Sequence, residues 1–401
     1  MPMSDAANVA EQPTPEELVK RARDLIPYLK EQASRAQADR QVPRETVQKM
    51  QDAGLFRVLQ PARWDGYQME PNTFFEVQMA LAEGCMSTAW IYGVIAVHNW
   101  QLALFDLKAQ EEVWQDDTTV LLSSSYMPVG KVERVEGGFN FRGRWAFSSG
   151  CDHCDWVLVG GVVPQDDKDA LMDFRTFLVP RRDYEIVDTW HTFGLQGTGS
   201  KDIVIEGCFV PEYRTHRALD DMMRNNPGID TQTVPLYQIP FGQLFPRAVS
   251  TASIGATQGA INAYMEIVAK RVGRNDGAKT AEDPHAQMAL ARAQSLVNQL
   301  KLKLFANMEK LMADVREGGS TDINTRIQFR YEAAEVPELC LNEVLELQKM
   351  CGGSGIFLDN PIQRFALDIL AGRAHVANNL YTFGRNYGGV MLGQDTKDFF
   401  L

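Results

Sequence analysis

Residues Trp145–Trp156 read WAFSSGCDHCDW, a stretch that combines two cysteines, a histidine and two aspartates with a pair of serines. The cysteines and the histidine raise the possibility of a metal site. His153 lies between Cys151 and Cys154, however, so these three side chains cannot ligate one tetrahedral ion without strain, and a structural zinc site normally requires a second ligand pair. The other cysteines show no such spacing. We therefore expect no metal here.

Short β-like runs flank this stretch on both sides, which disfavours a thioredoxin-like redox pair, because such a pair lies at the strand-to-helix turn of a βαβ unit. Residues 119–226 contain several β-branched or alternating runs separated by Gly, Pro and Asp, and Glu136-Gly137-Gly138 is a plausible hairpin turn. Short strands at near-regular spacing are typical of a small antiparallel barrel or sandwich. We expect a middle antiparallel β-domain at 119–226.

Helical patterns precede this domain, over residues 14–118. The sequence TPEE at 14–17 is a capping box with Pro at the first helical position, and Pro27 should bend the helix that follows. The apolar run that begins after Asn72 is too long for strands. It predicts buried helices broken near Gly84–Ser87.

Residues 227–401 return to long periodic helical segments, which predict a C-terminal four-helix bundle. Residues 1–13 have the composition of a disordered tail. The sequence therefore predicts an α+β fold in the order α, β, α. An N-terminal helical domain, a middle antiparallel β-domain and a C-terminal four-helix bundle follow one another.

The composition argues against several classes of protein. The formal net charge is −12 and no basic stripe is present, which argues against a nucleic-acid partner, since clustered Lys and Arg drive phosphate binding. No window holds the ~18 uninterrupted apolar residues of a membrane span, and the amino end lacks the pattern of a secretory signal. The six scattered cysteines do not form a disulfide framework in 401 residues, so we expect reduced thiols in the cytoplasm.

Three motifs resemble those of one flavoprotein superfamily. GRWAFSSG at 143–150 matches a strand that lines the flavin, FGLQGTGSKDIVIEGCFVPEYR at 193–214 matches a glycine-rich turn with its following strand, and ASIGATQGAINAY at 252–264 matches a bundle helix. The chain thus resembles the acyl-CoA dehydrogenase superfamily over nearly its whole length, which implies the same α, β, α order. Val376 stands where the dehydrogenases often place a catalytic glutamate. The resemblance therefore disfavours proton abstraction from an acyl thioester.

Longer segments are similar to one branch of that superfamily, the oxygenase components of two-component flavin-dependent phenol hydroxylases. They include HNWQLALFDLKAQEEVW at 98–114, SSSYMPVGKV at 123–132 and WAFSSGCDHCDWVLVGG at 145–161. Such oxygenases act on p-hydroxyphenylacetate or on a phenolic seco-steroid of bacterial sterol degradation. The resemblance implies a homotetramer that ortho-hydroxylates a phenolic substrate with O2 and reduced flavin (FMNH2 or FADH2), through a flavin C4a-hydroperoxide.

The chain has no evident nicotinamide-binding motif. Neither a GxGxxG sequence after a strand nor a GxxxxGK[ST] sequence is present, and GTGSKD at 197–202 satisfies neither pattern. The chain is therefore not expected to reduce its own flavin. A separate NAD(P)H:flavin reductase is implied.

The resemblance also assigns roles to single residues. Ser149 would bond the N5 region of the flavin and suppress the loss of hydrogen peroxide. His98 and Ser124 match phenol-binding positions, and His98 is of a type suited to act as a base near neutral pH. His375 matches a late histidine beside the reaction centre. Trp90 is a further substrate-binding candidate, and the other flavin-binding candidates are Trp145, Ser148, Thr198, Ser200, Arg271 and Arg373.

Without the resemblance, the same residues have ordinary structural interpretations. His98, within GVIAVHNW, is typical of a packed core histidine, and single tryptophans are more often core residues than cofactor contacts. Relatives carry an Arg-Asp pair where this chain has Leu367-Asp368. Two alternatives to a phenol hydroxylase stay open: an acyl-CoA dehydrogenase-like flavoprotein acting on a thioester, and a non-catalytic flavin-binding protein.

Overall fold

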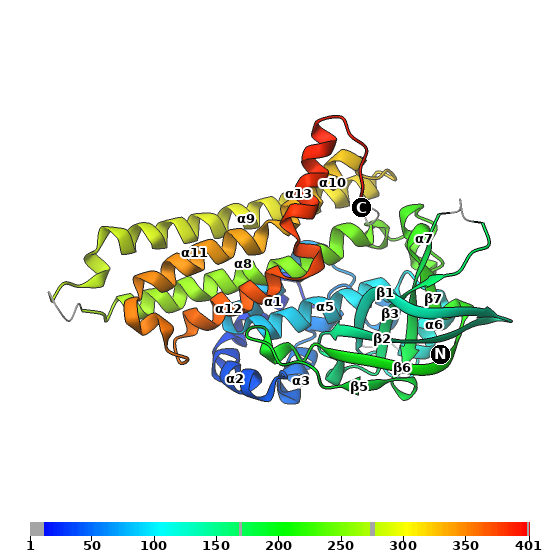
Figure 1. The fold of residues 1–401 in the computed structure, drawn as a ribbon, viewed down its shortest axis with the longest axis horizontal. Coiled ribbons are helices and arrows are strands. Elements are labelled where there is room, and N and C mark those ends of the chain that lie inside the picture. The colour runs from blue at the N-terminus through cyan, green and yellow to red at the C-terminus, as the bar shows by residue number, and fades with distance from the viewer. Residues whose placement is uncertain (1–11, 168–170, 273–276, 399–400) are drawn as a thin grey trace, which may run out of the picture.

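The chain folds in the order helices, strands, helices. Figure 1 shows the strands at one end of the molecule and a long helical bundle at the other. The computed structural model describes residues 12–167, 171–272, 277–398 and 401. The expected α+β architecture is confirmed.

The domain limits at 14–118, 119–226 and 227–401 stay predictions. The described strands all lie between Leu122 and Arg217, inside the middle segment. Of the expected tail, residues 1–11 lie outside the described residues.

The N-terminal region consists of α1 (Pro15–Asp24), α2 (Ile26–Asp39), α3 (Arg44–Asp52), α4 (Pro71–Gly84), α5 (Met86–Leu102) and α6 (Leu107–Trp114). The expected capping box is formed, because Thr14 Oγ1 accepts the Glu17 N–H and the Glu17 carboxylate accepts the Thr14 N–H. Helices α1 and α2 are separated at Leu25, two residues before Pro27. The extended residue Cys85 separates α4 from α5, which confirms the expected break.

The described strands form a seven-stranded sheet in the order β5-β6-β2-β1-β3-β4-β7. Their bounds are β1 (Leu122–Val135), β2 (Gly138–Ser148), β3 (Trp156–Val163), β4 (Asp173–Pro180), β5 (Glu185–Val187), β6 (Lys201–Pro211) and β7 (Thr215–Arg217). The β1–β2 hairpin turns at Glu136 and Gly137, as expected, and Gly137 has a φ of 78°, a conformation that favours glycine.

One strand pair corrects the expectation of a wholly antiparallel domain. Strands β1 and β3 run parallel, with Leu122 opposite Trp156 and Ser125 opposite Val159. The reason lies in the connection between β2 and β3. Strand β2 ends near the start of β1, and a short turn at 149–155 carries the chain to the other edge of β1, so β3 starts beside Leu122 and runs in the same direction.

The sheet closes over its own aromatic core. Phe141 of β2 stacks on Phe177 of β4 with ring centroids 4.1 Å apart, although β1 and β3 separate these strands in the sheet order. Trp145 is fully buried in the same cluster, and its Nε1–H donates to the carbonyls of Met127 and Gly160. The two halves of the sheet therefore face each other, as in a sandwich.

The C-terminal region contains the expected four-helix bundle, formed by α8 (Phe241–Val268), α9 (Pro284–Arg316), α11 (Val336–Met350) and α12 (Pro361–Arg373). Three further helices lie outside it: α7 (Ala218–Met222), α10 (Ile323–Ala334) and α13 (Leu380–Met391). Helices α10 and α13 pack together at one end of the bundle (Figure 1). No helix in the described part of the chain is both long enough and apolar enough to cross a membrane.

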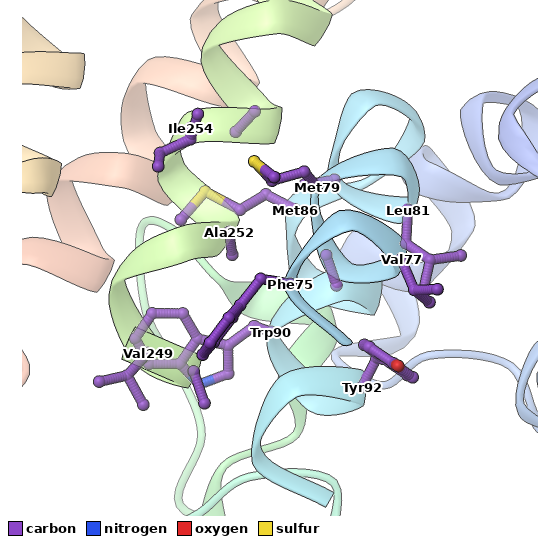
Figure 2. Packing of buried hydrophobic residues seen from close by; sticks show 14 of the residues in the cluster. Phe75, Val77, Met79, Leu81, Met86, Trp90, Tyr92, Val249, Ala252 and Ile254 are labelled. Carbon is purple, nitrogen blue, oxygen red and sulfur yellow. The ribbon is translucent and has the colours of Figure 1, made fainter. Parts of the chain in front are cut away.

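Helix α5 connects the three regions. It is buried along its whole length and packs against α4, α8 and β1. Figure 2 shows Trp90 pointing from α5 toward α8, within a cluster that includes Phe75 and Val249. His98 and Trp90 are thereby held where the sheet, α5 and the bundle meet.

The Phe141–Phe177 stack generates a stability prediction. Phe177→Ala should lower the unfolding free energy by about 3–5 kcal/mol, the usual cost of removing a buried aromatic ring. Phe209→Ala is the matched control, because Phe209 lies on β6 with half of its surface exposed, and it should change stability by under about 0.5 kcal/mol. Chemical denaturation checks both variants. Equal losses would contradict the assignment of Phe177 to the core.

Candidate active site

The turn after β2 directs Ser149 away from the sheet edge. Phe147 has a φ of 66°, a left-handed conformation that is unfavourable for a bulky residue, and the pairing of β2 with β6 shifts register between Trp145 and Ser148. Phe147 is 62% exposed as a result, whereas Ser148 is fully buried. Gly150, with a φ of 71°, completes the turn.

Ser149 belongs to a short chain of hydroxyl groups. Its Oγ lies 2.7 Å from Ser200 Oγ, and Ser200 Oγ lies 2.6 Å from Thr198 Oγ1. The Thr198 hydroxyl donates to the Leu195 carbonyl at 2.8 Å. Trp90 Nε1–H donates to Ser149 Oγ at 3.2 Å. Three predicted flavin-binding residues and one predicted substrate-binding residue are therefore brought together from the turn after β2, the 193–200 loop and α5.

A buried carboxyl group of the bundle anchors this loop. Leu195 has a φ of 51°, and its N–H donates to Asp368 Oδ1 at 2.6 Å. A Cβ atom on Gly194 would lie 2.1 Å from the Leu367 carbonyl, so this close approach requires glycine. Burial raises the pKa of Asp368 to about 6. The Asp368 carboxyl group thus accepts a hydrogen bond from the loop backbone.

His98 presents an unused acceptor. Its Nδ1 lies 2.8 Å from the Leu122 carbonyl, which only accepts, so we assign the ring proton to Nδ1. Nε2 is buried and has no hydrogen-bond partner among the described residues. Burial lowers the pKa of His98 to about 4, against the opposing effect of the Leu122 hydrogen bond. His98 is therefore neutral at physiological pH, with a free lone pair on Nε2.

Aromatic rings link His98 to the other histidine. Phe245 of α8 lies 6.4 Å from the His98 ring and 6.2 Å from the His375 ring, between centroids. Tyr126 lies edge-on to both His98 and Phe245. The Tyr126 hydroxyl donates to Gln101 Oε1, and Ser124 lies two residues before Tyr126 on β1. An apolar, flat-walled surrounding of this kind suits an aromatic ligand.

His375, whose ring also lies near Phe245, stands at the start of a short 3-10 turn (Val376–Asn378). Its Nδ1 accepts the Ala377 N–H at 3.1 Å, and its ring lies 5.8 Å from Trp90. Burial, and then the charge of Arg330, lower the pKa of His375 to about 4. Val376 is 78% exposed. This segment therefore offers a neutral imidazole to the site and no carboxylate.

The remaining predicted residues lie elsewhere in the fold. Trp145 is enclosed in the β core with its N–H bonded to backbone, and Ser148 Oγ donates to Ser123 Oγ at 3.1 Å. Arg271 donates to the Met350 carbonyl and Arg373 pairs with Glu338, so the bonded partners of both arginines lie on α11. Flavin contacts by these residues stay predictions.

Two aromatic residues near the site, Phe147 and Phe245, were not predicted from the sequence. Phe147 exposes its ring beside Ser149 and lies edge-on to Trp190, with centroids 6.1 Å apart, and Phe245 joins the two histidines. The position of Phe147 two residues before Ser149 was a usable signal. In a regular strand, however, residues 145, 147 and 149 share one face, and the sequence does not reveal the bulge between them.

The cysteines of the opening stretch are buried. Cys151 Sγ faces the Gly199 carbonyl and Cys154 Sγ faces the Gly150 carbonyl, and burial raises the pKa of both thiols. Among the described residues, no three His, Cys, Asp or Glu side chains gather in a way that could hold a metal ion.

Comparisons with known proteins define the class first. Two family models match this chain: "Acyl-CoA dehydrogenase, N-terminal domain" over residues 12–117 and "Acyl-CoA dehydrogenase, C-terminal domain" over residues 248–380. The crystal structure of 3-HSA hydroxylase from Rhodococcus sp. RHA1 superimposes with a TM-score of 0.91 at 35% identity, covering 96% of this chain and 99% of that one. The chain therefore has the acyl-CoA dehydrogenase fold.

Curated relatives define the branch. The oxygenase subunit HsaA of a flavin-dependent monooxygenase from Rhodococcus jostii (strain RHA1) is 38% identical over 88% of this chain and 93% of that protein. The oxygenase component of the FADH2-dependent resorcinol hydroxylase from Rhizobium sp. (strain MTP-10005) is 31% identical over 98% of both chains. The chain belongs to the family of flavin-dependent monooxygenase oxygenase subunits. These relatives support the oxygenase interpretation over the dehydrogenase alternative.

The Asp368 anchor generates a pH prediction. Because its pKa is raised to about 6 in the folded chain from an ordinary 3.8, the stability that Asp368 contributes is fully present below about pH 4 and is lost as the pH rises through 6. Asp368→Asn keeps an oxygen that can accept the Leu195 N–H but does not titrate. The unfolding free energy of the wild type minus that of the variant should fall between pH 4 and 7 in chemical denaturation. If this difference in unfolding free energy does not depend on pH, Asp368 is not the titrating group.

Proposed function

We propose that this oxygenase hydroxylates a phenolic substrate at the carbon ortho to its hydroxyl group, with O2 and reduced flavin as cosubstrates. The observation that carries the proposal is the buried, unpartnered Nε2 of His98 within a surrounding of aromatic rings. An unsatisfied buried acceptor is costly, and a phenolic O–H is a donor on a flat apolar ring. Such a ligand satisfies both the free acceptor of His98 and its aromatic surroundings.

The residues present fit a flavin at the neighbouring turn. Ser149 and Ser200 form a hydroxyl pair that can donate to or accept from a flavin ring edge, and Phe147 offers an exposed aromatic face next to them. Thr198 extends the hydroxyl pair, and we propose that these four residues hold the isoalloxazine. When bound, reduced flavin and O2 supply the electrophilic oxygen atom. The buried side chains of Trp90 and His98 help to exclude water from this region.

His98 orients the phenol. Its neutral Nε2 accepts the phenolic O–H, and Ser124, two residues after Leu122 on β1, is a second contact for the same oxygen. Complete proton transfer would place a cation in a buried site, which burial opposes. A phenolate held against the imidazolium offsets this cost. Shifting the proton toward His98 enriches electron density at the ortho carbon, which is the carbon that receives the oxygen atom.

The substrate class is the finer part of the proposal. HsaA and the 3-HSA hydroxylase structure cover nearly the whole of this chain, and on that similarity we propose a phenolic seco-steroid as the substrate. The resorcinol hydroxylase relative is named as an oxygenase component. Together with the absence of a nicotinamide motif, this supports a separate NAD(P)H:flavin reductase as the partner.

We also propose a homotetramer. Several large apolar side chains at the end of the bundle and on the C-terminal helices are exposed in the single chain: Ile356, Phe357, Leu358, Val376, Tyr381, Met391 and Leu392. Exposed apolar surface of this extent is typical of a subunit interface. Sedimentation of the purified protein at micromolar concentration tests the assembly, and a monomer would refute it.

The hydroxyl chain generates a prediction about coupling. Ser149→Ala removes a hydrogen bond worth about 0.5–1.5 kcal/mol from the turn beside the flavin, so hydrogen peroxide release should rise at the expense of hydroxylated product. Product and peroxide per reduced flavin consumed are measured together. Ser123→Ala is the control, because Ser123 is a fully buried serine on the neighbouring strand, and its coupling should stay near the wild-type value. Unchanged coupling in Ser149→Ala would exclude Ser149 from the mechanism.

The free acceptor generates a prediction about rate. His98→Ala should slow hydroxylation by roughly 10²–10⁴-fold, the range typical of a general base, while oxidation of reduced flavin by O2 continues. A more acidic phenol, already ionised at the assay pH, should recover part of the lost rate. His216→Gln is the matched control, because His216 is also buried, with its pKa lowered to about 4 and Nε2 bonded to Asn226. If His98→Ala forms product at the wild-type rate, His98 is a structural core residue and has no role in the reaction.

A further inference from the structure

The backbone around His375 determines which ring nitrogen carries its proton. Nδ1 accepts the N–H of Ala377 at 3.1 Å. A nitrogen that accepts a hydrogen bond carries no proton, so the proton of the neutral ring must lie on Nε2. His375 is therefore a donor, in contrast to His98, whose Nδ1 donates to Leu122 and whose Nε2 accepts.

A second contact fixes the same backbone segment. The Ala377 carbonyl accepts from Arg330 Nη1 at 2.8 Å. Arg330 is 5% exposed, and its guanidinium lies 3.4 Å from the ring centroid of Phe383, on α13. The Ala377 N–H thus binds His375 while its carbonyl binds Arg330. The side chain of Arg330 restrains the turn that orients the imidazole.

The charges around His375 favour its neutral form. Arg330 on α10 acts on it directly. Arg247 on α8 is a second buried cation in the neighbourhood of Arg330, donating to the Glu332 carbonyl at 3.3 Å. Arg373, at the end of α12, pairs with Glu338 of α11, and α5 contributes Trp90 and the neutral His98. Asp398 acts electrostatically on Arg330. The cationic groups nearest to His375 oppose a second proton on the ring.

We propose that Arg330 is a positioning residue that holds His375, through Ala377, as a neutral Nε2–H donor, while His98 presents an Nε2 acceptor. This inference rests on the proposed function, since it gives complementary roles to two histidines whose rings both lie near Phe245. One accepts the phenolic proton, and the other donates a hydrogen bond to the reacting oxygen atoms. Neither role requires a charged imidazole in the resting enzyme.

The test measures the tautomer itself. The chain contains six histidines, so labelling with ¹⁵N-histidine gives few signals. The signals of the two His375 ring nitrogens are identified by their loss in His375→Gln. Solid-state spectra should show His375 protonated at Nε2 alone from pH 8 to about 5. In Arg330→Met, the turn loses its restraint and the ring loses the nearby cation, so Nδ1 protonation should begin at a higher pH than in the wild type, although burial still holds the pKa below the ordinary value of about 6.5. Arg330→Lys, which keeps the charge and one donor, should restore much of the wild-type behaviour.

Arg326→Met is the matched control, because Arg326 lies one helical turn earlier on α10 and donates to the Leu401 carbonyl. It should leave the His375 signals unchanged. In turnover, Arg330→Met should lose up to about 10²-fold in product formation, as expected for a slightly misplaced reacting group, and its pH profile should acquire a new acidic limb. Wild-type His375 protonated at Nδ1, or wild-type shifts and pH response in Arg330→Met, would overturn the proposal. The spectra need no flavin or phenol, so failure of the proposed hydroxylation leaves this result readable.

Discussion

The left-handed conformation of Phe147 is the constraint on which the site depends. A residue of this size at a φ of 66° is strained. The strain accompanies a bulge that changes which side chains of this segment face the helices. Trp145 stays in the β core, Phe147 turns outward, and Ser149 meets the Trp90 N–H of α5. The serine is thereby connected to the helical region, where the two histidines lie.

The titratable groups of the site share a second feature: each is buried or partly buried and lacks a salt-bridge partner among the described residues. His98 and His375 both have their pKa lowered to about 4, chiefly by burial. Asp368, which holds the 193–200 loop, has its pKa raised to about 6 for the same reason. The two histidines are therefore neutral at physiological pH, and all three groups are fixed by backbone hydrogen bonds: Leu122 for His98, Ala377 for His375 and Leu195 for Asp368. A site built from neutral, oriented groups is suited to enclosing an apolar ring and a reactive oxygen atom.

Much of the fold was predictable because its signals are local. The TPEE capping box, the break at Cys85 and the hairpin at Gly137 each depend on a few neighbouring residues, and each occurs as expected. The parallel β1–β3 pair was not predictable, because it depends on where a seven-residue connection crosses the sheet. The resemblance proposed Ser149, His98, Trp90 and His375 as site residues, and contacts in the structure link them. The sequence could not reveal the tautomers of the two histidines or the role of Arg330, since these depend on long-range contacts. It also could not reveal that Phe147 rather than Trp145 faces outward, because this depends on one bulge.

The measurement that tests the account most directly is a single turnover without any reductase. The purified protein is mixed with photoreduced flavin, ¹⁸O₂ and a set of phenols that includes a phenolic seco-steroid, and the products are analysed by mass spectrometry. The account predicts one ¹⁸O atom incorporated ortho to the phenolic hydroxyl, with the seco-steroid among the best substrates. Release of hydrogen peroxide alone from every phenol, or desaturation of an acyl thioester in a parallel reaction, would contradict it.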